Sequence, residues 1–248
     1  MRTCILVLAA LFTVPAASAA SETYLYRTEL IQAAPGKLLE LISLLQARAA
    51  ALETAGDAAP FWMRHSQGDH WDLMLLYPMG SYGEYYSSER IAKRGKAESG
   101  AAEITGRIKA DIAWQEDVFV HGPPLEMLKS AFANSKFFHI EMFIALADHR
   151  AGLYKEREME NAYSKALNLP ENLIFLRDQG AAWDLFTIGF YRDLGHYAES
   201  AGILPAKQEA AAKAAGFDSA SQIGPYLRRF IATHHDTLAV ALPAPARQ

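Results

Sequence analysis

The chain has 248 residues, of which 51% are hydrophobic and 21% are charged, and its formal net charge is −4. This composition is typical of a globular protein that forms one large domain or two small ones. A mildly acidic chain without a basic run has no electrostatic basis for binding nucleic acid or an anionic membrane, so neither is expected as a partner.

The first twenty residues predict an export signal. A short basic start, Met1-Arg2, precedes an apolar run at 5–14 and a small-residue stretch at 17–20. This order is typical of a secretory signal peptide, which we assign to residues 1–20. The apolar run is too short for a membrane span, which needs about 20 residues. We therefore expect a periplasmic or secreted protein that is not inserted in a membrane after cleavage. Cleavage would also remove the only cysteine, Cys4, and leave no disulfide or thiolate.

The rest of the sequence contains an internal repeat. Residues 67–73, Gln-Gly-Asp-His-Trp-Asp-Leu, recur as Gln-Gly-Ala-Ala-Trp-Asp-Leu at 179–185, a shift of 112. Near the ends of the two copies the shift is 119, as when Ile112-Ala113 matches Ile231-Ala232. We interpret the seven extra residues as part of an added helix near 205–216. The expected organisation is a first unit at 21–122, a linker at 123–135 that contains Pro123-Pro124, and a second unit at 136–248.

Each copy has the same predicted elements. Leu38, Leu41, Ile42 and Leu45 follow helical spacing, and Gly68 marks a hairpin turn between two β-rich segments. In the first copy we expect strands at 23–32, 61–66, 71–77 and 113–120, with helices near 38–52 and 81–109. In the second copy we expect strands at 137–145, 173–178, 182–190 and 231–241, with a first helix at 148–167 that is rich in charge.

This β-α-β-β-α-β order is typical of a ferredoxin-like unit, with four antiparallel strands in the order 4-1-3-2 and both helices on one face. The other face of each sheet is bare, and two units can bury their bare faces against each other. The predicted fold class is therefore α+β, with two tandem ferredoxin-like units that form an intramolecular α/β-barrel.

In element order and in the Gly-x-x-Trp-Asp-Leu hairpin at 68–73 and 180–185, the chain resembles the dimeric α/β-barrel superfamily in a tandem-fused form. That superfamily includes antibiotic-biosynthesis monooxygenases, heme-degrading monooxygenases, chlorite dismutases, dye-decolourising peroxidases and NIPSNAP-like proteins. The resemblance covers nearly the whole mature chain but includes no catalytic motif. It implies a cavity between the sheets, and association into a homodimer is a further expectation. Fold alone does not define function.

Alternation along the strand at 137–145 separates two faces. Phe138, Ile140 and Met142 form an apolar face, which we expect to lie under the helices. His139 and Glu141 then point to the bare face, into the space between the sheets. In the first copy Arg27 and Glu29 occupy the matching positions and would form a polar wall that contacts substrate.

The neighbouring strand carries three further polar residues, His234, His235 and Asp236. Alternation lets one of the two histidines share a face with His139, and the sequence leaves open which one does. The candidate catalytic residues are His139, Glu141, His235 and Asp236, and the candidate metal ligands are His139, Glu141 and His234. Trp183 is a candidate substrate contact, although the recurrence of Trp-Asp in both copies favours a structural role.

Two functions are compatible with this pattern. One is an enzyme, monooxygenase-like or lyase-like, that acts on a small organic molecule between the sheets. The other is a non-catalytic periplasmic binding or assembly module, in which ion pairs such as Arg27 with Glu29 stabilise a polar sheet interface. The cofactor is not determined: two histidines and a carboxylate suit non-heme iron, zinc or copper. Heme is less favoured, because His149 and His196, its candidate ligands, lie in no recognisable context.

Overall fold

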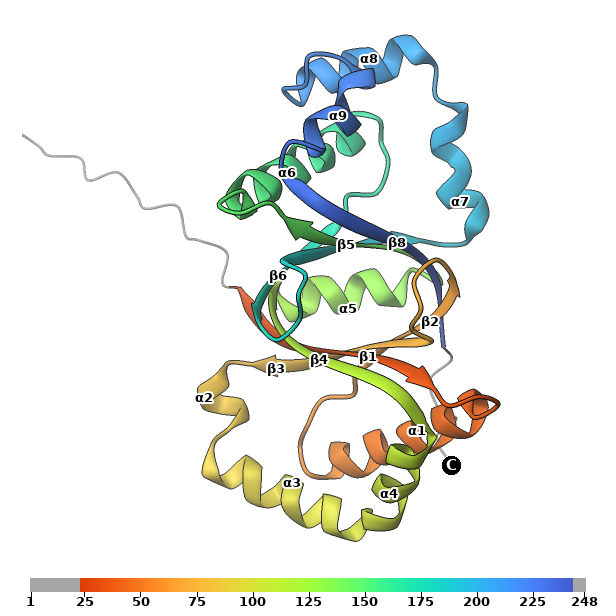
Figure 1. Ribbon diagram of the computed structural model, residues 1–248, viewed down its shortest axis with the longest axis vertical. Coiled ribbons are helices and arrows are strands. Elements are labelled where there is room, and N and C mark those ends of the chain that lie inside the picture. The colour runs from red at the N-terminus through yellow and green to blue at the C-terminus, as the bar shows by residue number, and fades with distance from the viewer. Residues whose placement is uncertain (1–22, 243–248) are drawn as a thin grey trace, which may run out of the picture.

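Within residues 23–242, eight antiparallel strands form a closed barrel in the order β1-β3-β2-β8-β5-β7-β6-β4 (Figure 1). The computed structural model describes residues 23–242, so the predicted signal peptide lies outside the described residues. The strands are β1 (Tyr24–Ala33), β2 (Phe61–Gln67), β3 (Leu73–Gly80), β4 (Ile112–Gly122), β5 (Phe137–Ala145), β6 (Leu173–Gln179), β7 (Leu185–Tyr191) and β8 (Ile231–Ala241).

The two halves of the chain have the same strand order, β4-β1-β3-β2 in the first and β8-β5-β7-β6 in the second. Each order matches the 4-1-3-2 arrangement expected from the sequence, and the predicted α+β class is confirmed. The halves meet where β2 pairs with β8 and where β4 pairs with β6. The helices are α1 (Leu38–Thr54), α2 (Tyr82–Tyr85), α3 (Ser88–Gly100), α4 (Ala102–Asp111), α5 (Leu125–Ala133), α6 (Arg150–Ala166), α7 (Leu194–Ala198), α8 (Pro205–Ala214) and α9 (Ile223–Leu227).

Helices cover the outside of the barrel on two opposite sides (Figure 1). Helices α1, α3 and α4 lie over the first half, and α6, α8 and α9 lie over the second. Each cover buries its own apolar cluster: Leu41 of α1 packs with Leu75 of β3, and Leu153 of α6 packs with Phe143 of β5. Helix α8 falls within the region where the repeat predicts an added helix. Within the described residues, no helix has the length and apolar character that a membrane span requires.

The interior of the barrel is packed with apolar side chains. Tyr26, Met74, Phe138, Ile140 and Phe186 belong to one buried cluster that draws on both halves of the chain. The prediction that Phe138 and Ile140 lie under the helices is therefore wrong. The interior of a closed barrel is covered on every side, so in β5 it receives the face whose side chains are apolar.

Helix α5 lies between the two halves of the barrel, in the segment predicted to be a linker (Figure 1). Leu128 is fully buried in the shared core, and the Phe132 ring stacks on Phe61 of β2 and contacts Phe138 of β5. The linker prediction missed this helix because Pro123-Pro124 suggested an irregular segment. The spacing of Leu125, Leu128 and Phe132 is helical and was the available signal.

The repeated hairpins explain why the Gln-Gly motif occurs twice. Gly68 follows β2 with φ of +122°, and a Cβ there would overlap the backbone of Asp236 and Thr237 on β8. Gly180 follows β6 with φ of +109°, and a Cβ there would lie 2.7 Å from the carbonyl oxygen of Asp117 on β4. Each hairpin thus packs closely on the last strand of the other half, which only glycine permits.

Candidate functional site: a histidine–carboxylate cluster under helix α6

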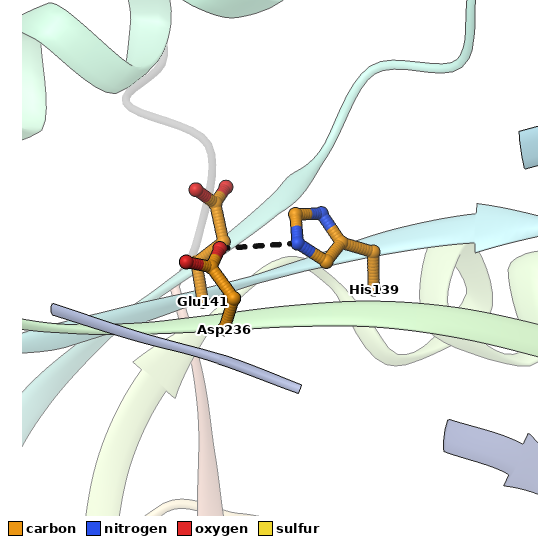
Figure 2. A group of neighbouring side chains, drawn as sticks. All are labelled: His139, Glu141 and Asp236. Carbon is orange, nitrogen blue, oxygen red and sulfur yellow. Dashed lines mark hydrogen bonds and ion pairs between the residues drawn. The ribbon is translucent and has the colours of Figure 1, made fainter. Parts of the chain in front are cut away.

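The cluster is built on two hydrogen-bonded central strands. Glu141 of β5 lies directly opposite Asp236 of β8, and His139 lies two residues along β5 on the same face. His139 Nε2 is 3.2 Å from Asp236 Oδ1, and Figure 2 shows the imidazole directed at this carboxylate with Glu141 beside it. One candidate ligand atom from each of the three residues lies within 4.8 Å of the other two.

The cluster faces helix α6, not the barrel interior. Arg157 of α6 approaches Glu141 with its Nη1 3.4 Å from Oε2, and Thr187 of β7 donates to the same oxygen at 3.2 Å. The predicted placement of His139 and Glu141 between the sheets is therefore wrong, and so is the predicted polar sheet interface. A charged strand face needs a partner, and α6 supplies one, whereas the interior supplies none.

Negative charge exceeds positive charge around Arg157. Its guanidinium contacts Glu156 at 2.7 Å and Glu160 at 2.7 Å in addition to Glu141. Glu156 is fully buried, and burial, opposed by Arg157, raises its pKa to about 8. Burial also raises the pKa of Glu160. With Asp236, four carboxylates lie near one guanidinium. Burial is the main cause of the raised pKa values of Glu156 and Glu160, and repulsion from neighbouring carboxylates adds to it.

Asp236 and Glu141 both act on His139. Burial lowers the pKa of this imidazole, but the hydrogen bond to Asp236 and the charge of Glu141 outweigh burial, so the pKa of His139 is raised. The same hydrogen bond lowers the pKa of Asp236. The raised pKa of His139 favours the protonated imidazole, which can donate to Asp236.

The structure decides which of the two adjacent histidines joins the cluster. His234 Nε2 is 3.2 Å from Asp236 Oδ2, the oxygen that does not contact His139, and its ring stacks on Phe143. His235 is exposed and pairs with Met142 on the opposite face of the two strands. The predicted catalytic position of His235 is therefore not part of this cluster.

Three further predicted residues lie elsewhere. Arg27 and Glu29 share a face of β1 in the first half, with Arg27 3.7 Å from Glu29 and 3.4 Å from Asp117. Trp183 is buried in the barrel core and donates from Nε1 to Glu116 at 2.9 Å. The structure thus does not bring these residues to His139, and the prediction that they share one substrate pocket with it is wrong.

Sequence reasoning missed the residues that α6 and α7 contribute. Arg157 and Glu160 come from α6, and the Tyr197 ring of α7 lies 5.4 Å from the His139 ring. The available signal was the charged stretch 155–158, which interrupts the apolar face expected of a helix packed on a sheet. A helix of that kind predicts charged partners on the strands beneath it.

The two histidines considered for heme are engaged in other contacts. His149 is exposed at the N-terminus of α6, where its ring meets Phe230. His196 of α7 accepts a hydrogen bond from the backbone of Arg192 on Nδ1. Neither lies in the cluster around His139, so these residues do not fit the role of an axial heme ligand in this site.

Comparison with solved structures shows a shared fold. By sequence, no family profile and no characterised protein matches the chain. A protein from Fusobacterium nucleatum described as a "putative monooxygenase" aligns with a TM-score of 0.53 and 11% identity, over 89% of this chain and 93% of that chain. A mutant chlorite dismutase from Candidatus Nitrospira defluvii aligns with a TM-score of 0.51 and 13% identity, over 90% and 93%. A second protein described in the same words as the first, from Lactobacillus acidophilus, aligns with a TM-score of 0.50 and 9% identity, over 88% and 94%.

The chain shares the fold of these ferredoxin-like α/β-barrel proteins. At 9–13% identity the likeness concerns the backbone arrangement and assigns no reaction or ligand. The resemblance to NIPSNAP-like proteins and to antibiotic-biosynthesis monooxygenases stays a prediction.

Proposed function

We propose that this protein is an exported oxidase-like enzyme whose reactive centre is a divalent transition-metal ion held by His139, Glu141 and Asp236. The observation that carries the proposal is the convergence of one imidazole and two carboxylates, from adjacent central strands, within 4.8 Å. We also propose that the two halves are tandem copies of one ferredoxin-like unit, that the substrate is a small organic molecule and that the chain associates into a homodimer.

The spacing of the donor atoms supports a metal ion. Two neighbouring ligands bound at about 2.0–2.2 Å lie about 2.8–3.1 Å apart in an octahedral site and about 3.3–3.6 Å apart in a tetrahedral one. His139 Nε2 and Asp236 Oδ1 are 3.2 Å apart, which lies between these two ranges. A mixed nitrogen and oxygen donor set suits iron, manganese or zinc, and His234 next to Asp236 offers a further imidazole.

The local charge supports a cation as well. Glu141, Glu156, Glu160 and Asp236 can carry four negative charges beside the single guanidinium of Arg157. In the absence of a cation, the cluster reduces this excess by keeping protons, as the raised pKa values of Glu156 and His139 indicate. A divalent ion would replace those protons, so metal affinity should rise with pH.

The oxidase-like character rests on the neighbours of this fold that are described as monooxygenases. A redox-active ion at this position would supply electron transfer or oxygen chemistry. The chain itself contributes an imidazole ligand in His139 and a positioning contact from Arg157 to Glu141. Asp236 is half-exposed, which leaves the cluster accessible from solvent.

Metal binding by the purified mature protein tests the proposal. Isothermal titration with Mn²⁺, Fe²⁺ under anaerobic conditions and Zn²⁺ should show one site per chain, and Asp236→Asn should weaken it at least about tenfold. Asp117→Asn is the matched control, because Asp117 occupies the equivalent position in the first half beside Gln115, where the second half has His234. Equal affinity in wild type and Asp236→Asn would contradict the proposal.

An ion-pair network without metal is the competing interpretation, and it corresponds to the non-catalytic alternative. The contacts that favour it are those of Arg157 and the His139–Asp236 pair, which satisfy one another without a ligand. It predicts that His139→Ala and Asp236→Asn alter only the melting temperature. Elemental analysis and a visible absorption spectrum of the protein as purified distinguish the two interpretations directly.

A further inference from the structure

A cavity of about 280 Å³ lies in the first half of the chain, between the sheet and helices α1 and α3. Its floor is the outer face of the sheet, where Arg27 of β1 and Tyr77 of β3 are direct cross-strand partners. Helix α1 contributes Arg48, and helix α3 contributes Arg94. Three guanidinium groups therefore line one small cavity.

Two of these guanidinium groups have donors without acceptors. The Nε atoms of Arg27 and Arg48 are buried and have no hydrogen-bond partner among residues 23–242. Arg48 forms no salt bridge with any residue in the described part of the chain, and Arg27 lies 3.7 and 3.4 Å from its two acids, longer than the about 2.7–2.9 Å of a charge-assisted hydrogen bond. Because a buried donor without a partner is costly, an acceptor in the cavity would stabilise this arrangement.

The acids that line the cavity do not supply that acceptor. Asp57 is engaged by Arg90 at 2.7 Å and by Arg94 at 3.7 Å. Glu98 is exposed, and among the described residues it forms no salt bridge. A bound molecule that carries an acceptor would satisfy these donors.

Aromatic rings define the shape of that molecule. The Arg27 guanidinium lies 4.3 Å from the centre of the Tyr77 ring, and Arg94 lies 3.8 Å from that of Tyr85. Tyr86 also lines the cavity. Burial and then the charge of Glu29 raise the pKa of Tyr77 well above its usual value, so its phenol stays protonated and is a poor acceptor for the arginines. The volume is at the lower end of ligand pockets, which fits a planar molecule of one or two rings.

We propose that this cavity binds a small aromatic carboxylate, with its carboxylate on Arg27 and Arg48 and its ring among Tyr77, Tyr85 and Tyr86. A guanidinium presents parallel N–H donors that match the two oxygens of a carboxylate, which favours this group over a compact anion. The proposal is independent of the proposed metal centre, because no residue of the cavity belongs to the histidine–carboxylate cluster.

Benzoate and 1-naphthoate are the probes that test this site, with benzamide as the uncharged equivalent of benzoate. Isothermal titration of the wild-type protein should give saturable binding of at least one carboxylate at or below about 10 mM, and benzamide should bind at least about tenfold more weakly. Arg48→Gln should weaken carboxylate binding at least about tenfold. Arg107→Gln is the control, because Arg107 is an exposed arginine of α4 that does not line the cavity.

The comparison of benzoate with benzamide uses the wild-type protein alone, so it holds even where a variant is unstable. Equal binding of benzoate and benzamide, no binding of either carboxylate up to about 10 mM, or unchanged benzoate binding by a folded Arg48→Gln variant would each overturn the proposal. Loss of metal binding in Asp236→Asn with benzoate binding intact would confirm that the two sites are separate.

Discussion

Glu141 and Asp236 are direct cross-strand partners on β5 and β8, and both carboxylates face helix α6. The first half repeats this relationship, because Glu29 lies directly opposite Asp117 on β1 and β4. The paired acids are thus a shared feature of the two halves. What differs is the group beside them, an imidazole from His139 in one half and a guanidinium from Arg27 in the other.

Removal of the Asp236 charge should lower the pKa of His139. Asp236→Asn eliminates the charged hydrogen-bond acceptor that opposes the effect of burial on this imidazole. Histidine titration followed by NMR measures the change directly. The loss of stability should stay below about 1 kcal/mol, because Asp236 is half-exposed.

The matched variant Asp117→Asn should leave the His139 titration unchanged, since Asp117 lies in the other half of the barrel. An unaltered His139 pKa in Asp236→Asn would show that the hydrogen bond is not formed in solution.

Stability should fall as the pH rises from about 5 to 8, and Glu156 should cause part of that fall. The folded state holds the Glu156 proton up to a pKa of about 8, whereas the unfolded chain releases it near 4.5. The folded state therefore binds more protons in this interval, so this contribution is fully present below pH 4.5 and lost by about pH 8. The slope for one proton is at most about 1.4 kcal/mol per pH unit.

Glu156→Gln should flatten this dependence in urea unfolding curves measured at several pH values. Glu158→Gln should leave the pH dependence unchanged, because Glu158 lies two residues further along α6 and its side chain is exposed. Parallel pH profiles for wild type and Glu156→Gln would rule out the buried protonated glutamic acid.

Helix α5 should contribute to stability as part of the core. Leu128 is fully buried in the shared cluster, so Leu128→Ala should lower the free energy of unfolding by about 2–5 kcal/mol. Met127 is 53% exposed on the same helix, and Met127→Ala should change it by less than about 0.5 kcal/mol. Similar small effects in both variants would show that α5 is not packed on the barrel in solution.

Gly68→Ala should destabilise the closure of the barrel. The substitution places a Cβ against the backbone of Asp236 and Thr237 at a φ of +122°. Thermal unfolding should report a loss of more than about 1 kcal/mol. Gly83→Ala is the control, because a Cβ on Gly83 meets nothing within 4 Å and its α2 conformation suits alanine.

The sequence was sufficient for the order of the strands and for their arrangement within each half, because the repeat and the hairpin motif are local signals. It also placed His139, Glu141 and Asp236 on adjoining strands, and the structure brings these residues together. It was misleading about which side of the sheet they face. Alternation separates two faces of a strand but does not say which face a helix covers.

The side of the sheet that these residues face depends on how the whole barrel and its helices pack. The interior of the closed barrel excludes unpaired charge, and α6 carries Arg157 to neutralise the acids beneath it. The helix at 148–167 was recognised as charged from the sequence, yet its partners depended on a packing angle that periodicity does not define. The cavity around Arg48 was missed for the same reason, since its lining comes from three helices and two strands.

Helix α5 makes the connection between the halves a structural component in its own right. Leu125, Leu128 and Phe132 cover apolar surface that belongs to both halves. Neither half made as a separate fragment would have its complete interior, and a flexible replacement of equal length would leave Phe61 and Phe138 uncovered. Cooperative, single-step assembly of the entire chain is the expected consequence, with residues 125–133 docking as the second half closes upon the first.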